Sequence, residues 1–303
     1  MTYESAAALE MAVKAAAVAS SLDTNRAISS FYFHRLLCRV FAGRNDAFIL
    51  KGGHSMLART VGARATRDID LLARQGDLNT ALERLKELAE TDMGDFVTFE
   101  FAGSRPIKVE DEYRDGLSVQ FVPFIGSKRM QRISVDLVVD EVPLEGAELI
   151  APADRLDIGG LQTCDYLIYP LESAMADKLC ALVETHDGRA SSRVKDLVDI
   201  VICATTCLIN GEKLQQRVRR ETAIRKIALP RSFHVPENWG ESHKKQFEKL
   251  CTQTGLPDSL KILGSATQLA RELFDPALAG TADGMTWNPS TTTWEEQNHC
   301  DKQ

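Results

Sequence analysis

Residues 51–72, KGGHSMLARTVGARATRDIDLL, decide the fold that we expect of this chain. A short β-rich run enters the pair Gly52-Gly53, a helical segment follows, and a second strand carries Asp68 and Asp70. Side chains two residues apart in an extended strand point to the same face, so the two carboxylates project together. Neighbouring carboxylates repel each other unless a cation lies between them, and a divalent metal ion is the usual solution.

The residues before the acidic strand are of the kind that bind phosphates. Glycines let backbone amides approach a triphosphate closely, and the Ser55 hydroxyl can add a further contact. We therefore expect Lys51, Gly52, Gly53 and Ser55 to bind a nucleotide. A glycine pair alone usually marks a turn, and an isolated Asp-x-Asp is commonly a solvated strand edge. The order strand, glycine pair, helix, acidic strand is more specific than either.

The rest of the chain divides into an α+β half and a helical half. Residues 1–43 show helical periodicity. Residues 47–142 combine short alternating strands with one amphipathic helix, LNTALERLKELAET at 78–91. Further helices are predicted at about 171–186, 190–209, 212–227, 241–254 and 258–274. We expect an α+β domain over 1–150 and a helical domain over 151–274. Residues 275–303 are polar and lack periodicity, so we expect a disordered tail.

Composition indicates a soluble protein of the cytoplasm. The 303 residues are 44% hydrophobic, and no apolar run is long enough to span a membrane. The seven cysteines show no zinc-type spacing and are expected to be reduced.

A net charge of −7 argues against nucleic-acid binding by the chain as a whole. Residues 189–231, however, hold ten Lys or Arg against four Asp or Glu, a local charge of +6. That segment is either a solvated surface or a site for an RNA backbone.

Lys178 has an unusual place in the predicted helix 171–183. It falls inside the apolar stripe of that helix, where an unpaired ammonium group would be costly to bury. Either the side chain snorkels to solvent, or the cation is directed at phosphates or carboxylates of a site. In the next helix, Asp196 and Asp199 lie opposite the apolar stripe. By pattern alone, these two are ordinary solvent-facing acids.

Two blocks of the sequence resemble a known family. FILKGGHSML followed by RATRDIDLL is similar to the AbiEii/AbiGii toxins, members of the polymerase-β-like nucleotidyltransferase superfamily and toxins of bacterial, type IV-like toxin–antitoxin pairs. The spacer between Gly53 and Asp68 is slightly longer than the superfamily norm. The family's EKL…R…KD…D block matches as Asp177-Lys178-Leu179, Arg193, Lys195-Asp196 and Asp199, with Asp177 in place of the more frequent Glu.

The resemblance implies a polymerase-β-like α+β domain with a mixed sheet, and a helical C-terminal domain that completes the active site. It implies that Lys178 and Asp196 join Asp68 and Asp70 there. A third carboxylate comes from a neighbouring strand in such folds. Asp136 in ISVDLVVD is the candidate for it, with Asp140 later on the same strand face.

From the residues and the resemblance together we expect a Mg²⁺-dependent nucleotidyltransferase. Asp68 and Asp70 would hold Mg²⁺, Lys178 would offset phosphate charge, and Asp136 or Asp196 would orient or deprotonate the acceptor. The resemblance implies NMP transfer from an NTP to RNA, with the 3′ end of tRNA favoured, and a cognate antitoxin protein as partner. Two alternatives stay open: a nucleotidyltransferase or kinase acting on a small molecule or protein, and a nucleotide-binding regulator without turnover.

Overall fold

The computed structural model describes residues 3–60, 62–107, 116–139, 146–186 and 188–297. The chain forms two compact units. Unit 1 comprises Met1–Val61 and Ala65–Tyr169, and unit 2 comprises Gly62–Arg64 and Pro170–Gln303. The backbone therefore leaves unit 1 for three residues, just before the acidic strand, and then returns.

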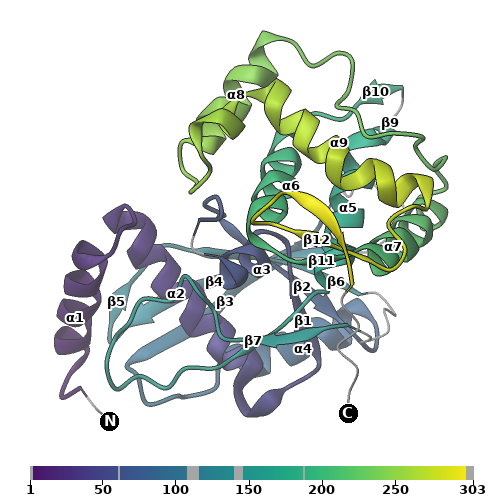
Figure 1. Ribbon diagram of the computed structural model, residues 1–303. Helices are drawn as coiled ribbons and strands as arrows, with labels where there is room; N and C mark the ends of the chain where they lie inside the picture. Colours follow the sequence, from purple (N-terminus) through teal and green to yellow (C-terminus); the bar gives the residue numbers. More distant parts are fainter. Residues whose placement is uncertain (1–2, 61, 108–115, 140–145, 187, 298–303) are drawn as a thin grey trace, which may run out of the picture. The chain divides into compact units, whose positions relative to one another are not determined.

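Unit 1 is built on a mixed sheet with helices (Figure 1). Its helices are α1 (Ala6–Ala19), α2 (Thr24–Phe41), the 3-10 turn η1 (Ala42–Arg44), α3 (Gly52–Arg59) and α4 (Leu78–Ala89). Its strands are β1 (Phe48–Lys51), β2 (Asp68–Ala73), β3 (Val97–Pro106), β4 (Gly116–Ile125), β5 (Lys128–Arg129), β6 (Ile133–Val139), β7 (Glu148–Ile150) and β8 (Tyr166–Ile168).

The strand order is β3-β4-β6-β2-β1-β8-β7, with β5 paired to β4. The pairs β2–β6 and β1–β8 are parallel, whereas β1–β2 and β4–β6 are antiparallel. Buried and partly buried residues alternate in β2 as far as Leu71 and in β6 as far as Val138. This alternation places their apolar side chains in the core and leaves the aspartates on the other face.

The core of unit 1 lies between that apolar sheet face and the helices. Buried residues of α2 and α4 pack there against residues of the central strands: Leu36, Leu37, Leu85, Ile69, Leu71, Val135 and Leu137. Helix α4 begins where the sequence predicts, because the Asp77 side chain accepts a hydrogen bond from the Thr80 amide. The predicted α+β class and mixed sheet are confirmed.

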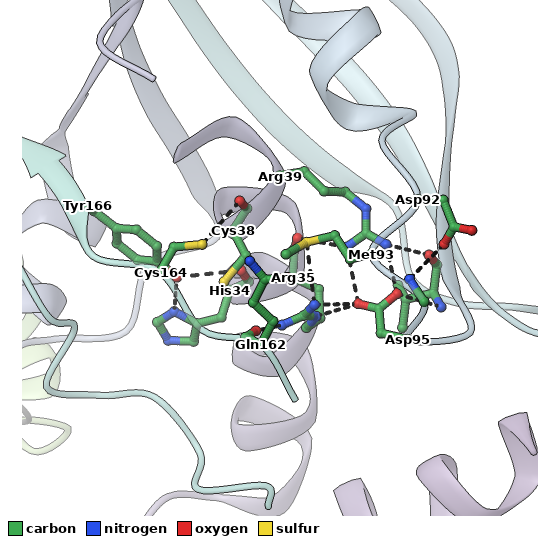
Figure 2. A network of polar contacts seen from close by, with 12 residues as sticks. His34, Arg35, Cys38, Arg39, Asp92, Met93, Asp95, Gln162, Cys164 and Tyr166 are labelled. Carbon is green, nitrogen blue, oxygen red and sulfur yellow. Dashed lines mark hydrogen bonds and ion pairs between the residues drawn. The ribbon is translucent and has the colours of Figure 1, made fainter. Parts of the chain in front are cut away.

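A buried polar network fixes α2 to the sheet (Figure 2). Arg35 Nε donates to Asp95 Oδ2 at 2.6 Å, and Arg39 Nη2 donates to Asp95 Oδ1 at 2.8 Å. His34 Nδ1 lies 2.8 Å from the hydroxyl of Tyr166 in β8. Burial alone would raise the pKa of Asp95, but the hydrogen bond and charge of Arg39 and the charge of Arg35 bring it below its ordinary value.

Unit 2 is mainly helical, as the sequence predicts. Its helices are α5 (Leu171–Val183), α6 (Val194–Thr206), α7 (Gly211–Ile224), α8 (Glu241–Cys251), the 3-10 turn η2 (Asp258–Lys261) and α9 (Leu263–Ala279). Its short strands are β9 (Thr185–His186), β10 (Arg189–Ala190), β11 (Ile209–Asn210), β12 (Met285–Asn288) and β13 (Thr293–Glu296). In α6, nearly every residue is buried, because α5, α8 and α9 all contact it.

The structure differs from the expected domain bounds in two places. The boundary falls after Tyr169 rather than near residue 150, because β8 pairs with β1 and so belongs to the sheet of unit 1. The expected disordered tail is ordered as far as it is described: β11, β12 and β13 form a small sheet. Trp287 accounts for this, since its ring is fully buried and its Nε1 donates to the Ala204 carbonyl at 2.8 Å. Residues 298–303 lie outside the described residues.

In the parts of the chain that are described, no helix is both long and apolar enough to cross a membrane.

Candidate active site

A row of carboxylates crosses two neighbouring strands of unit 1. Strands β2 and β6 run parallel in a register that places Asp70 beside Asp136, with Asp68 two residues earlier on the same face of β2. Ile69 and Val135, on the opposite face, are fully buried. The structure thus brings together Asp68, Asp70 and Asp136 on one sheet face, at the spacing of adjacent strands, about 4.8 Å.

Lys51 and Gly52 extend this row to a third strand. Strand β1 pairs antiparallel with β2, and Lys51 lies opposite Asp70. The Lys51 Nζ lies 4.1 Å from the centroid of the Tyr169 ring, a cation–π contact. Gly52 adopts a left-handed φ of 61°, and a Cβ atom at this position would overlap Asp70 Oδ2. Glycine is required here to make room for a carboxylate.

Gly53 makes room for a different side chain, that of Thr66. A Cβ atom on residue 53 would lie 2.7 Å from both Cβ and Oγ1 of Thr66. Thr66 Oγ1 in turn donates to Asp68 Oδ1 at 3.0 Å. Gly52 therefore leaves room for the Asp70 carboxylate, and Gly53 leaves room for Thr66, which contacts Asp68. Sequence reasoning missed Thr66, although its hydroxyl two residues before Asp68 is a visible signal.

The start of α3 has the character of a phosphate site. Lys51 is the N-cap residue and its side chain does not cap the helix, so the first amides are not satisfied by a capping side chain. Amides at a helix N-terminus attract anions. Ser55 is 2% exposed, and its hydroxyl donates to the Gly52 carbonyl at 2.8 Å. Its proton is thus already used inside the helix, and the phosphate contact expected of Ser55 stays a prediction.

The donor set suits Mg²⁺, which prefers carboxylate oxygens and is commonly bound by one or two carboxylates together with water and substrate phosphates. Within the described ranges, no group of three His, Cys, Asp or Glu side chains is arranged to hold a metal ion by itself. That Asp68 and Asp70 hold such an ion together with the phosphates of a nucleotide stays a prediction. Asp140, the later candidate for a third carboxylate, lies outside the described residues.

The second set of predicted residues forms a buried ion-pair cluster in unit 2. Lys178 Nζ lies 2.7 Å from Asp199 Oδ2 and 3.1 Å from Asp196 Oδ1. The Lys178 side chain is 10% exposed, so its head is buried and paired, and the snorkelling alternative is wrong. Burial alone would lower the pKa of Lys178, but the charges of Asp199 and Asp196 raise it well above its ordinary value. The lysine therefore remains charged.

The interpretation of Asp196 and Asp199 as solvent-facing acids is wrong, since they are 2% and 1% exposed. Burial alone would raise the pKa of Asp196, but the charges of Lys178 and Arg193 bring it well below its ordinary value. Arg64, which sequence reasoning missed, forms an ion pair with Asp199: Nη2 donates to Oδ2 at 2.9 Å, and Nε lies 2.8 Å from Oδ1. Because Lys178, Arg193 and Arg64 compensate the charges of Asp196 and Asp199, the acidic face of α6 is buried as well as its apolar face.

The predicted site residues thus form two groups, one in each unit. Unit 1 holds the aspartate row, Lys51, the glycines and Ser55, whereas unit 2 holds Lys178 and Asp196. That the two groups act in one active site stays a prediction.

Only part of the basic segment 189–231 is available to a partner. On α7, Lys213, Arg219 and Arg220 are exposed. Arg225 is buried and pairs with Glu184 and Glu221, each at 2.7 Å. The basic residues therefore have two different roles. Arg225 belongs to a buried ion-pair cluster, whereas Lys213, Arg219 and Arg220 form an exposed basic surface.

Comparison with known proteins gives a family and a fold. The family model described as "Nucleotidyl transferase AbiEii toxin, Type IV TA system" matches residues 35–275. No curated protein sequence matches the chain. MenT4, a nucleotidyltransferase toxin of Mycobacterium tuberculosis H37Rv, is similar in structure with a TM-score of 0.51 and 15% identity, over 90% of this chain and 98% of that one. JHP933 from Helicobacter pylori gives a TM-score of 0.44 and 14% identity, over 86% and 97%.

Proposed function

Since the chain belongs to the AbiEii family of nucleotidyltransferase toxins of type IV toxin–antitoxin systems, we propose that it transfers an NMP group from an NTP to the 3′ end of tRNA. The reaction depends on Mg²⁺, takes place in the cytoplasm and blocks translation, and a cognate antitoxin protein restrains it. Its family makes the chain a nucleotidyltransferase and a toxin; the ion, the acceptor and the site residues are our proposal.

The aspartate row beside the glycine turn is the observation that carries the proposal. Asp70 and Asp136 lie side by side in register, and Gly52 leaves just enough space for the Asp70 carboxylate. The uncapped start of α3 follows directly. Carboxylates for a metal ion and amides for phosphates therefore lie within one short piece of unit 1.

The chemistry is an in-line displacement at the α-phosphorus. Mg²⁺, when bound, supplies charge neutralisation for the triphosphate and for the leaving group. Asp68 and Asp70 would hold it, and the amides of α3 with the Lys51 ammonium would orient the phosphates. The acceptor hydroxyl oxygen forms a bond to the α-phosphorus, the bond to the β-phosphate oxygen breaks, and pyrophosphate leaves.

Asp136 is the better candidate for the base that takes the acceptor proton. It lies beside Asp70 in the row. Asp196, by contrast, is held by Lys178 and Arg193, and its strongly lowered pKa makes it a poor proton acceptor. We therefore assign Asp196 the task of holding Lys178 in place, and Lys178 that of offsetting phosphate charge.

Exposed Lys213, Arg219 and Arg220 on α7 support an RNA acceptor over a small molecule. Cationic side chains on a surface helix provide the sequence-independent attraction for a phosphate backbone. Most RNA-binding affinity of this kind does not require base contacts.

Labelled-NTP transfer tests the proposal. The purified protein is incubated with each α-labelled NTP, Mg²⁺ and total RNA, and Asp70→Ala is compared with Asp283→Asn, which changes an exposed carboxylate. We expect label in RNA of tRNA size for the wild type and Asp283→Asn but not for Asp70→Ala. Label only in protein or in a small molecule contradicts the RNA acceptor, and no label in any fraction contradicts turnover.

Growth provides a second readout. Expression of the wild type should arrest growth, and Asp70→Ala should not. An equally toxic Asp70→Ala protein contradicts an enzymatic origin of toxicity.

A further inference from the structure

The hydroxyl of Thr66 is aimed at the first aspartate of the row. Thr66 Oγ1 lies 3.0 Å from Asp68 Oδ1 and 3.4 Å from the Asp68 carbonyl oxygen. A hydroxyl has one proton to donate, and a bond to an ionised carboxylate is the stronger one. The shorter distance agrees with this choice, so the proton of Thr66 lies toward Oδ1.

The glycine turn holds the Thr66 side chain in place. Both Cβ and Oγ1 of Thr66 approach Gly53 so closely that residue 53 has no room for a side chain. A β-branched side chain has few accessible χ1 rotamers, and packing on one side reduces them further. The direction of the hydroxyl is therefore set by the same glycine turn that begins α3.

We propose that Thr66 is a positioning residue, which uses the glycine turn as its support and holds the Asp68 carboxylate in the orientation that binds a nucleotide-bound divalent cation. The inference rests on the proposed function of the aspartate row. One oxygen of Asp68 is anchored by Thr66, which leaves the carboxylate its other lone pairs for the cation. A ligand held by a hydrogen bond loses less freedom on binding than one that rotates freely.

Three variants separate hydrogen bonding from packing. Thr66→Val keeps the shape and removes the donor, and Thr66→Ser keeps the donor and removes the methyl group. Thr267→Val is the matched control, because the Thr267 hydroxyl donates to the Leu263 carbonyl inside α9 rather than to an aspartate of the row. Thermal unfolding of each variant reports whether it is folded.

Direct titration with Mn²⁺, in the presence of a non-hydrolysable NTP analogue, is the readout. We expect Thr66→Val to weaken Mn²⁺ binding by about 10- to 100-fold. Thr66→Ser and Thr267→Val should stay within about threefold of the wild type, since both keep the Asp68 hydrogen bond. Thr66→Val binding Mn²⁺ as tightly as the wild type overturns the role of Thr66. A loss in Thr66→Ser equal to that in Thr66→Val also overturns it, because packing would then be the cause.

The outcomes distinguish this inference from the proposed function. If the wild type itself binds no Mn²⁺ with the analogue, the proposed metal-dependent function fails. If the wild type binds and Thr66→Val binds equally, only the role of Thr66 fails. Should Thr66→Val not fold, Thr66→Ala replaces it as the variant without a donor, with the same expected weakening and the same contradicting result.

Discussion

Arg64 and Asp199 form an ion pair in which Nη2 donates to Oδ2 at 2.9 Å and Nε lies 2.8 Å from Oδ1. Asp199 is 1% exposed and also contacts Lys178, so the carboxylate is shared by two cations in a buried place. Removing one partner of a buried pair leaves charge uncompensated, which is costly.

Arg64→Ala should therefore destabilise the protein by about 3 kcal/mol, the lower end for a buried pair because Lys178 remains. Urea unfolding measures this. Arg84→Ala is the matched control: Arg84 is 49% exposed and pairs with exposed Glu87, a contact worth less than about 1 kcal/mol. Equal effects of the two substitutions would contradict a structural role for the Arg64–Asp199 pair.

Gly52→Ala should abolish most of the transfer activity. The new methyl group would overlap Asp70 Oδ2, and the backbone φ of 61° is unfavourable for alanine. A displaced carboxylate at a reacting centre costs on the order of 100-fold in rate. Gly264→Ala in α9, where a Cβ atom has open space, is the control and should remain active. Full activity of Gly52→Ala would show that displacing the Asp70 carboxylate does not lower the rate of transfer.

Asp136→Asn should lower kcat by about 10² to 10⁴, the range of a general base, because an amide cannot take the acceptor proton. Asp196→Asn should lower kcat less than Asp136→Asn, because it weakens the hold on Lys178 but leaves the proposed base in place. Steady-state rates of the two variants at pH 7 check both. If Asp196→Asn lowers kcat by the larger factor, the two assignments are reversed.

Asp95 makes the stability of unit 1 depend on pH. Its pKa is lowered in the folded protein, so the stabilisation is complete above the ordinary aspartate pKa of about 3.9 and is lost as the pH falls through the lower folded value. Asp95→Asn should cost about 3 to 5 kcal/mol at pH 7. This gap to the wild type should shrink below about pH 4.

Urea unfolding at pH 7 and at pH 3 measures the gap, with exposed Asp157→Asn as the control. A gap that stays constant between the two pH values would contradict ionisation of Asp95 as its source.

Salt should weaken RNA binding through α7. Each phosphate contact adds about 0.7 to the slope of log K against log salt for single-stranded RNA, so Arg219→Gln with Arg220→Gln should reduce the slope by about 1.4. NTP binding should be unchanged. Arg84→Gln, on α4, is the control. An unchanged slope in the double variant would exclude this helix from the RNA contact.

The sequence predicts unit 1 well where local pattern and tertiary packing agree. Period-2 alternation in β2 places Asp68 and Asp70 on one face, and the structure confirms it. The register that brings Asp136 beside Asp70 depends on the pairing of β2 with β6, which no local pattern contains. The reason for each glycine was likewise hidden, since the atoms that crowd Gly52 belong to Asp70 in the neighbouring strand β2.

In unit 2, helical periodicity predicts the helices but not the surroundings of α6. A polar helix face normally faces water, and Asp199 is buried only because Lys178 and Arg64 offset its charge. The final strands were missed for a related reason. Their polar composition suggests disorder, but the burial of Trp287 against α6 orders them.

Residues Gly62–Arg64 belong to unit 2 although unit 1 surrounds them in the sequence. The Gly255 amide donates to the Gly62 carbonyl at 3.1 Å, next to the Arg64 pair. A fragment that ends at Tyr169 would carry these three residues without the groups that bind them. Recombination or subcloning therefore cannot transfer unit 1 as one continuous piece of sequence. A chimaera of two such toxins would have to exchange Gly62–Arg64 together with Pro170–Gln303.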